Sequence, residues 1–309
     1  MESKLILHRG YKGKYPENSL ISFENAIKEG FPTEIDIRIT KDNVPVIIHD
    51  DNLDRLFNAS GKISNYTLEE LKDFYYVKIA EAENHPLQCV GECNLEHKRF
   101  AQNLANLCAE KSLGRFLLHP KAQKQTLTFK SGCTKGLFDK EDSTQTIATL
   151  NEFCEIMQNE ENKSSFVFIH IKKLKDVKVT MDVLNNFDLK ERIRFFVVDE
   201  LIEPFRKIMR KNHPEYKIGL HLYQNSPYYS EDKLKLFDFI WADEINFKWI
   251  DKNKVDLAHK LNKPFYAISP ELISDSIFNK NIQQRWKELL QSGVDGICTD
   301  RPDEFLSFT

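Results

Sequence analysis

Short apolar runs rich in β-branched and aromatic residues alternate along this chain with longer segments in which apolar residues return every three or four positions. The longer segments, such as 19–29, 200–211 and 282–291, are typical of helices that bury one face. Alternation of strands and helices indicates a parallel sheet covered by helices. Eight strands in this rhythm favour a closed TIM-type (β/α)8 barrel over a doubly wound sheet. The eight runs are 5–8, 34–39, 166–171, 193–198, 218–222, 239–242, 265–268 and 296–298.

Two segments depart from this rhythm. Lys41-Asp42-Asn43 separates 34–40 from 44–49, which predicts a hairpin rather than a new barrel strand. Residues 76–140 break the alternation altogether and gather cysteines, histidines and lysines. We interpret 76–140 as an inserted subdomain or cap, so that the barrel consists of 1–75 and 141–309.

Length, composition and charge set further limits. A chain of 309 residues with 41% hydrophobic residues fits one barrel with an insertion. The net charge of -3 gives no broad attraction to nucleic acid or to an anionic membrane, so any phosphate site must be local. No apolar run resembles a secretory leader or a membrane span, and we expect a cytoplasmic protein with six reduced cysteines. The sequence predicts no particular oligomeric state.

Polar residues gather where the expected strands end, which is where barrels of this type place their active sites. Glu34 and Asp36 lie two apart on one strand face, and His170 and Lys172 repeat this spacing on the next barrel strand. The first strand ends in His8-Arg9, a helix start carries Glu17, and the hairpin returns to His49.

These residue types are the parts needed to cleave a phosphodiester. Two carboxylates on one face bind a hard divalent cation, which neutralises charge on the phosphoryl oxygens. Arg9 and Lys172 add fixed positive charge. Two histidines can pass protons at neutral pH, one to activate the attacking hydroxyl and one to protonate the leaving oxygen.

The front of the chain also resembles a known family. The run HRGYKGKYPENS, then EID and VPVIIHDDNLDR, is similar to the signature of glycerophosphodiester phosphodiesterases, almost unbroken from His8 to Arg55. Further echoes occur at 68–71, at 148–153, around Lys172 and in the closing GVDGICTDRP, while 76–140 has no counterpart. The resemblance implies a barrel hydrolase that cleaves a diester to a phosphomonoester and an alcohol.

The resemblance also implies a role for each candidate residue. His8 and His49 would be the acid/base pair, and Glu17 would support Arg9. Glu34 and Asp36 would hold one divalent cation, Mg²⁺ or Ca²⁺. The phosphate contacts would be Arg9 and Lys172.

One departure from the family pattern concerns this cation. His170 stands where the family usually has a third metal-binding Glu, which removes a negative charge and presents nitrogen in place of oxygen. A softer ion such as Mn²⁺, Zn²⁺ or Ni²⁺ would then be favoured. Alternatively, Asp199 or Asp243 completes the shell, His170 binds no metal, or the metal site has decayed.

Other departures leave the substrate open. Asp243-Glu244 near one strand end, and Ser269-Pro270-Glu271 after another, hint at a diester other than simple glycerophosphodiesters. A glycan- or polymer-linked diester is one alternative, and an inactive barrel that binds a phosphorylated ligand is another. In the insertion, Cys89, Cys93 and His97 have residue types that bind zinc, although ordinary thiols are the default reading. The insertion also contains a lysine-bearing stretch that either faces solvent or binds an anionic substrate; its lysines are Lys121, Lys124, Lys130 and Lys135.

Overall fold

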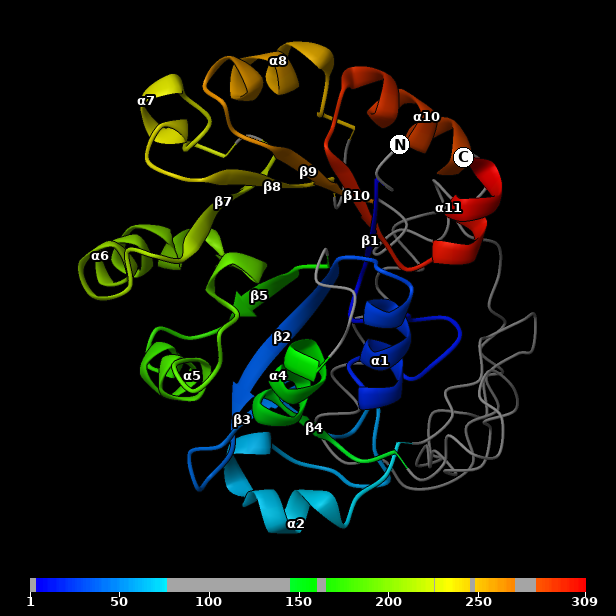
Figure 1. The fold of residues 1–309 in the computed structure, drawn as a ribbon, viewed down its shortest axis with the longest axis vertical. Coiled ribbons are helices and arrows are strands. Elements are labelled where there is room, and N and C mark those ends of the chain that lie inside the picture. Colours follow the sequence, from blue (N-terminus) through cyan, green and yellow to red (C-terminus); the bar gives the residue numbers. More distant parts are fainter. Residues whose placement is uncertain (1–3, 77–144, 160–164, 225, 245–247, 270–281) are drawn as a thin grey trace, which may run out of the picture. The chain divides into compact units, whose positions relative to one another are not determined.

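Eight parallel strands close into a barrel in the computed structural model, which describes residues 4–76, 145–159, 165–224, 226–244, 248–269 and 282–309 (Figure 1). Closure comes from β1, which pairs with β10 on one side and with β2 on the other, where Leu7 lies opposite Thr33. The predicted TIM-type barrel is therefore confirmed. Its strands in barrel order are β1 Leu5–Leu7, β2 Thr33–Ile39, β5 Val167–Ile171, β6 Ile193–Phe196, β7 Lys217–Tyr223, β8 Phe239–Asp243, β9 Phe265–Ile268 and β10 Gly296–Thr299.

A short antiparallel extension leaves the barrel at β2. The predicted hairpin is confirmed: β3 (Pro45–Ile47) pairs antiparallel with the end of β2, and Asn43 in the turn has a φ of 63°. A further strand, β4 (Ala148–Thr149), pairs with β3 and was not predicted, because two residues carry no periodicity. Most of the predicted insertion, 76–140, lies outside the described residues, and the proposed domain division stays a prediction.

Helices lie outside the strands and follow them in the chain (Figure 1). Side-chain caps begin several of them: Ser19 accepts from the backbone N–H of Ser22, and Thr67 forms a capping box with Glu70. No helix in the described ranges has the length and apolar content needed to cross a membrane, and the cytoplasmic location stays a prediction. The helices are α1 Leu20–Lys28, α2 Leu68–Lys72, α4 Leu150–Asn159, α5 Asp176–Leu184, α6 Ile202–Asn212, α7 Glu231–Leu234, α8 Lys252–Lys260, α10 Ile282–Ser292 and α11 Pro302–Phe308, with short 3₁₀ turns at η1 Ile63–Asn65, η4 Lys190–Arg192 and η5 Asp199–Leu201.

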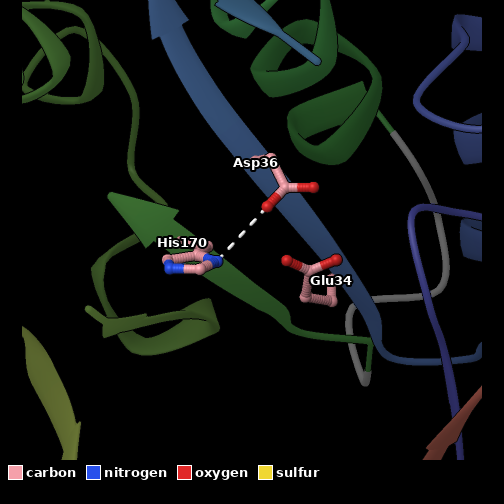
Figure 2. Close-up of side chains that lie close together, drawn as sticks. All are labelled: Glu34, Asp36 and His170. Carbon is pink, nitrogen blue, oxygen red and sulfur yellow. Dashed lines mark ion pairs between the residues drawn. The ribbon is translucent and has the colours of Figure 1, made fainter. Parts of the chain in front are cut away.

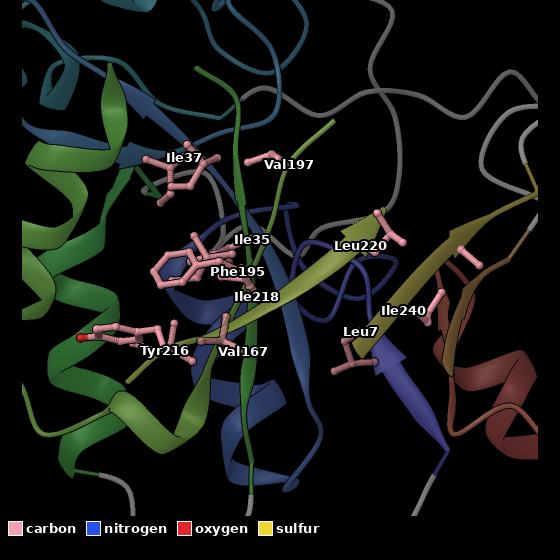
Figure 3. Packing of buried hydrophobic residues seen from close by; sticks show 14 of the residues in the cluster. Leu7, Ile35, Ile37, Val167, Phe195, Val197, Tyr216, Ile218, Leu220 and Ile240 are labelled. Carbon is pink, nitrogen blue, oxygen red and sulfur yellow. The ribbon is translucent and has the colours of Figure 1, made fainter. Parts of the chain in front are cut away.

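The barrel strands send alternate side chains in two directions, outward to the helices and inward to the barrel interior. Residues such as Ile35, Ile169 and Leu220 face the helices and join the larger core, part of which is drawn in Figure 3. Their neighbours point into the barrel, where a separate cluster fills the interior. That cluster contains Ile6, Phe168, Phe196, Phe239, Trp241, Tyr266, Ile268 and Cys298.

One glycine makes room for this aromatic interior. A Cβ at Gly219 would lie 2.2 Å from Cε2 of Phe239, so only glycine lets that ring fill the barrel beside β7. Toward the C-terminal ends of the strands the inward positions change from aromatic to ionisable. On β2 and β5, Glu34, Asp36 and His170 occupy them. The strand period thus places the candidate chemistry at one end of the barrel.

Candidate active site

Three of the predicted metal ligands lie together. Asp36 and His170 are opposite each other in the β2–β5 register, and Glu34 precedes Asp36 by two residues on the same face. One ligand atom from each of the three lies within 4.8 Å of the others, and all three side chains are buried or nearly so. Figure 2 shows the two carboxylates and the imidazole turned toward one another. In the described part of the chain this is the one group of its kind.

Three polar atoms of this group are available to ligate a divalent cation. Glu34 Oε2, Asp36 Oδ2 and His170 Nε2 are buried and have no hydrogen-bond partner within the described part of the chain. Burial and the neighbouring Asp36 carboxylate raise the pKa of Glu34 well above its usual range. A bound cation would oppose this shift, because a ligating carboxylate must be ionised. Oxygen and imidazole donors together suit Mg²⁺, Mn²⁺ or Zn²⁺.

Lys172 compensates the charge of the same carboxylates. Its Nζ lies 2.6 Å from Asp36 Oδ1 and 2.8 Å from His170 Nδ1. Although burial opposes ionisation, Lys172 and His170 hold the pKa of Asp36 well below its usual range. Burial and the Lys172 charge lower the pKa of His170 to about 3, so its ring is neutral at neutral pH. Asp36 is therefore ionised, and the imidazole of His170 is a neutral candidate metal ligand.

The first loop brings His8 and Arg9 to this group. Thr33 on β2 fixes the loop, because its hydroxyl accepts from the backbone N–H of Gly10 and donates to the carbonyl of Leu7. Gly10 has a φ of 80°, and a Cβ there would lie 2.2 Å from Ser22 Oγ, so the turn requires glycine. Arg9 has a φ of 58°, a strained value for a residue with a side chain.

His8 is oriented by a carboxylate that the sequence reasoning did not assign. Asp300, just beyond β10, lies 2.7 Å from His8 Nδ1, and Lys12 holds its other oxygen at 2.6 Å. His8 Nε2 lies 3.8 Å from Glu34 Oε2. Burial and the Arg9 charge lower the pKa of His8, which keeps the ring neutral. The closing TDRP run, noted only as an echo of the family, was the signal for Asp300.

Arg9 is held by Glu17. Its Nη1 donates to Glu17 Oε1 at 2.9 Å, while its Nε forms an ion pair with Asp36 Oδ2 at 3.4 Å and has no hydrogen-bond partner among the described residues. Arg55 donates to both oxygens of Glu17, at 2.7 and 3.0 Å, a contact that the sequence reasoning missed. Although burial opposes ionisation, Arg55 and Arg9 keep the pKa of Glu17 below its usual range. One free N–H of Arg9 thus faces the carboxylates.

His49 is more open than the other candidates. It follows the hairpin, its side chain is 39% exposed, and its Nδ1 lies 2.8 Å from Asp50 Oδ1. Arg38 fixes the backbone there by donating to the His49 carbonyl at 2.7 Å. His49 is thus placed at the rim of the site rather than in its buried part.

The alternative ligands lie elsewhere. Asp199 accepts from Ser226 Oγ at 3.4 Å, and Asp243 lies 3.7 Å from His221 Nε2, so neither joins the buried group. Glu244, the other acid near the end of β8, is buried against Arg285, whose Nε donates to it at 2.7 Å. The predicted zinc residues Cys89, Cys93 and His97, the lysines of 121–135 and Glu271 lie outside the described residues.

Comparison with known proteins matches most of the chain to one family. The model of the glycerophosphoryl diester phosphodiesterase family matches residues 8–304. A glycerophosphodiester phosphodiesterase of Bacillus altitudinis is 46% identical over 71 residues, 23% of this chain and 29% of that protein. Glycerophosphodiester phosphodiesterase 1 of Rattus norvegicus is 38% identical over 84 residues, 27% of this chain and 24% of that protein. These matches span less than a third of the length of either relative.

Solved structures share the fold over nearly the whole chain. A glycerophosphoryl diester phosphodiesterase from Parabacteroides distasonis superposes with a TM-score of 0.63 at 22% identity, covering 99% of this chain and 86% of that one. An Oleispira antarctica phosphodiesterase, solved with the product sn-glycerol-3-phosphate, gives 0.64 at 18% identity, covering 99% and 96%. At these identities the likeness establishes the barrel alone.

Proposed function

The chain belongs to the glycerophosphoryl diester phosphodiesterase family, and from this premise we propose that it hydrolyses a glycerophosphodiester to a phosphomonoester and an alcohol. The observation that carries the proposal is the buried group of Glu34, Asp36 and His170. The atoms of this group that lack a hydrogen-bond partner among the described residues would bind a cation. The Nε–H of Arg9 would bind a phosphate oxygen beside that cation.

The cation would be held by Glu34, Asp36 and His170. When bound, it supplies positive charge that stabilises the phosphoryl oxygens as negative charge builds on them. Arg9 binds a phosphoryl oxygen through its unpartnered Nε. Lys172, which has three N–H donors, keeps Asp36 ionised and offers a remaining N–H to the phosphate.

His8 and His49 would move the protons. With its Nδ1–H directed at Asp300, neutral His8 has a lone pair on Nε2 and accepts the proton of the attacking oxygen. His49 at the rim, oriented by Asp50, donates a proton to the departing alcohol oxygen. The attacking oxygen comes from water, or first from a neighbouring substrate hydroxyl that gives a cyclic diester later opened by water. In both cases one P–O bond to the alcohol breaks and one water is consumed.

The donor set favours an ion softer than Ca²⁺. Two carboxylates and a neutral imidazole carry a charge of about -2 when both acids are ionised, which suits Mn²⁺ or Zn²⁺ better than the oxygen-only shell of Ca²⁺. Mg²⁺ fits if it keeps several waters. We therefore propose one resident cation, with Mn²⁺ or Zn²⁺ ahead of Mg²⁺ and Ca²⁺.

One observation favours a second function, a barrel that binds a phosphorylated ligand without cleaving it. Lys172 and His170 already face Asp36 Oδ1, at 2.6 and 3.3 Å, so that oxygen has partners without a metal. The oriented His8–Asp300 pair weighs against this reading, because phosphate binding alone needs no such pair. A glycan- or polymer-linked diester remains the alternative substrate within the enzyme class.

Hydrolysis by metal-stripped protein tests the proposal. The protein is reconstituted with Mg²⁺, Ca²⁺, Mn²⁺ or Zn²⁺ and supplied with glycerophosphoglycerol, glycerophosphoethanolamine and bis(p-nitrophenyl) phosphate. We expect cation-dependent release of alcohol, lowered about 10²–10⁴-fold by His49→Ala. The matched control is His213→Ala, at the far end of α6, which should keep full turnover. Tight phosphate binding with no alcohol released under any cation would instead support the binding barrel.

A further inference from the structure

A second polar group lies at the C-terminal ends of β6, β7 and β8, next to the candidate cation site. We call it the β7–β8 subsite and define it as Asp199, His221 and Asp243. His221 is paired in register with the inward-facing Trp241, and Asp243 follows Trp241 by two residues on β8. Both side chains therefore face the barrel interior, like the candidate cation ligands on β2 and β5.

The subsite has buried polar atoms without partners. His221 is 8% exposed, and neither of its ring nitrogens has a hydrogen-bond partner among the residues that the structure describes. The closest acid in that part of the chain, Asp243, lies 3.7 Å from its Nε2, beyond hydrogen-bond length. Asp199 is 7% exposed, and its Oδ1 likewise has no hydrogen-bond partner in the described ranges. Buried polar atoms of this kind are costly and rare, and a ligand that satisfies them is the simplest explanation.

The subsite adjoins the proposed chemistry. The ring centroids of His170 and His221 are 6.4 Å apart. Phe196 on β6 packs against both, stacked on His170 at 4.4 Å and edge-on to His221 at 5.9 Å. A molecule with its phosphorus beside Glu34 and Asp36 needs only a short chain to reach His221.

The two sides of this barrel end differ in charge. Arg9, Lys12, Arg55 and Lys172 all form ion pairs around Glu17, Asp36 and Asp300 on the phosphate side. In the described ranges, Asp199 and Asp243 have no ion pair with any lysine or arginine. The β7–β8 subsite thus has two carboxylates that no lysine or arginine of the described residues neutralises.

We propose that the β7–β8 subsite binds the alcohol half of the diester and selects an alcohol that has a primary ammonium group, as ethanolamine does. This inference rests on the proposed function, because it assigns the leaving group of that reaction. A primary ammonium has three N–H donors, which match two carboxylates and one imidazole nitrogen. A quaternary ammonium has no N–H to donate, and a neutral polyol brings no charge to offset the acids.

Competition between two diesters tests the subsite. Glycerophosphoethanolamine and glycerophosphoglycerol are mixed with the wild-type protein and one cation, and the ratio of their kcat/KM values is measured. We expect the ethanolamine diester to be favoured about 10-fold, the usual effect of a hydrogen bond to a charged group. Asp243→Asn and, separately, Asp199→Asn should bring the ratio close to one. Asp188→Asn, an exposed acid between α5 and η4, is the matched control and should leave the ratio unchanged.

Each outcome decides the question. A ratio near one in the wild type, preference for the glycerol diester, or a preference that survives both Asp243→Asn and Asp199→Asn would overturn the inference. If neither diester is hydrolysed, the proposed function fails, and calorimetric binding of the same two diesters tests the subsite separately. Tighter binding of the ethanolamine diester that Asp243→Asn abolishes would uphold the subsite, and equal binding would overturn it. Circular dichroism confirms that each variant is folded.

Discussion

His170→Glu is the change that most directly tests the cation site. The new carboxylate would join Glu34 and Asp36, whose ligand atoms lie within 4.8 Å of that of His170. Without a cation, the added charge repels the ionised Asp36. With a cation between them, all three acids become ligands. The substitution should therefore destabilise the metal-free protein and strengthen its response to hard cations.

The size of the effect follows from this distance. Two unit charges 4.8 Å apart interact by about 3 kcal/mol at an effective dielectric constant of about 20. Burial and Asp36 raise the pKa of Glu34 and disfavour its ionisation, so Asp36 is the main source of repulsion, and Lys172 offsets part of it. We expect the metal-free variant to lose about 3 kcal/mol, or roughly 5–10 °C in Tm for a chain of this size. Saturating Ca²⁺ or Mg²⁺ should restore most of that loss.

Thermal unfolding of metal-stripped protein, with and without each cation, measures both effects. His170→Gln is the matched control, because it has the size of Glu and brings no charge. His170→Glu should gain about 10-fold or more in Ca²⁺ affinity over this control. It should also lose preference for Zn²⁺, which the imidazole favours. If every cation shifts the Tm of both variants as it shifts that of the wild type, residue 170 is not a ligand and the proposed donor set is wrong.

Three further predictions concern stability. Glu244→Gln breaks the buried pair with Arg285 and should cost about 3–5 kcal/mol of unfolding free energy in urea; a loss below about 1 kcal/mol would contradict a buried ion pair. Gly219→Ala forces a Cβ against Phe239 and should cost about 1–3 kcal/mol, whereas an unchanged urea midpoint would show that the ring has room to move. His8 and Lys12 lower the pKa of Asp300 to about 2, although burial opposes ionisation. Because the folded pKa lies below the unfolded one, about 2 kcal/mol of stability is present above about pH 4 and is lost as the pH falls toward 2. Urea unfolding across this range should show a shallower acid loss in Asp300→Asn, and identical slopes would remove Asp300 as the cause.

The barrel was predictable because its strands obey a simple period. Each predicted run overlaps a barrel strand, since buried parallel strands are short, apolar and separated by helices. The same period predicted that Glu34 and Asp36 share a face, and that His170 and Lys172 do. The cross-strand register that places Asp36 opposite His170 was not readable from the chain. Pairing between strands 134 residues apart leaves no local signal.

Partners from distant loops were missed for the same reason. Asp300 orients His8 from 292 positions away, and Arg55 reaches Glu17 across 38. Only closure of the barrel, with β1 between β10 and β2, brings the first pair together. The sequence could name residue types suited to phosphodiester cleavage, whereas the network that orients them required the fold.

His170 links the two polar groups of the barrel end. It lies 3.3 Å from Asp36 on one side, and its ring is 6.4 Å from that of His221 on the other. A carboxylate in its place would put a negative charge between the proposed cation and the proposed ammonium group and would attract both. A neutral imidazole, with its pKa lowered to about 3 by burial and Lys172, puts no charge there at neutral pH. A histidine at position 170, which favours a softer metal ion than a glutamate would, therefore also leaves the proposed cation and the proposed ammonium group bound by separate sets of acids. On this argument His170 and the two acids of the β7–β8 subsite belong to one arrangement, a phosphodiester site suited to a cationic alcohol.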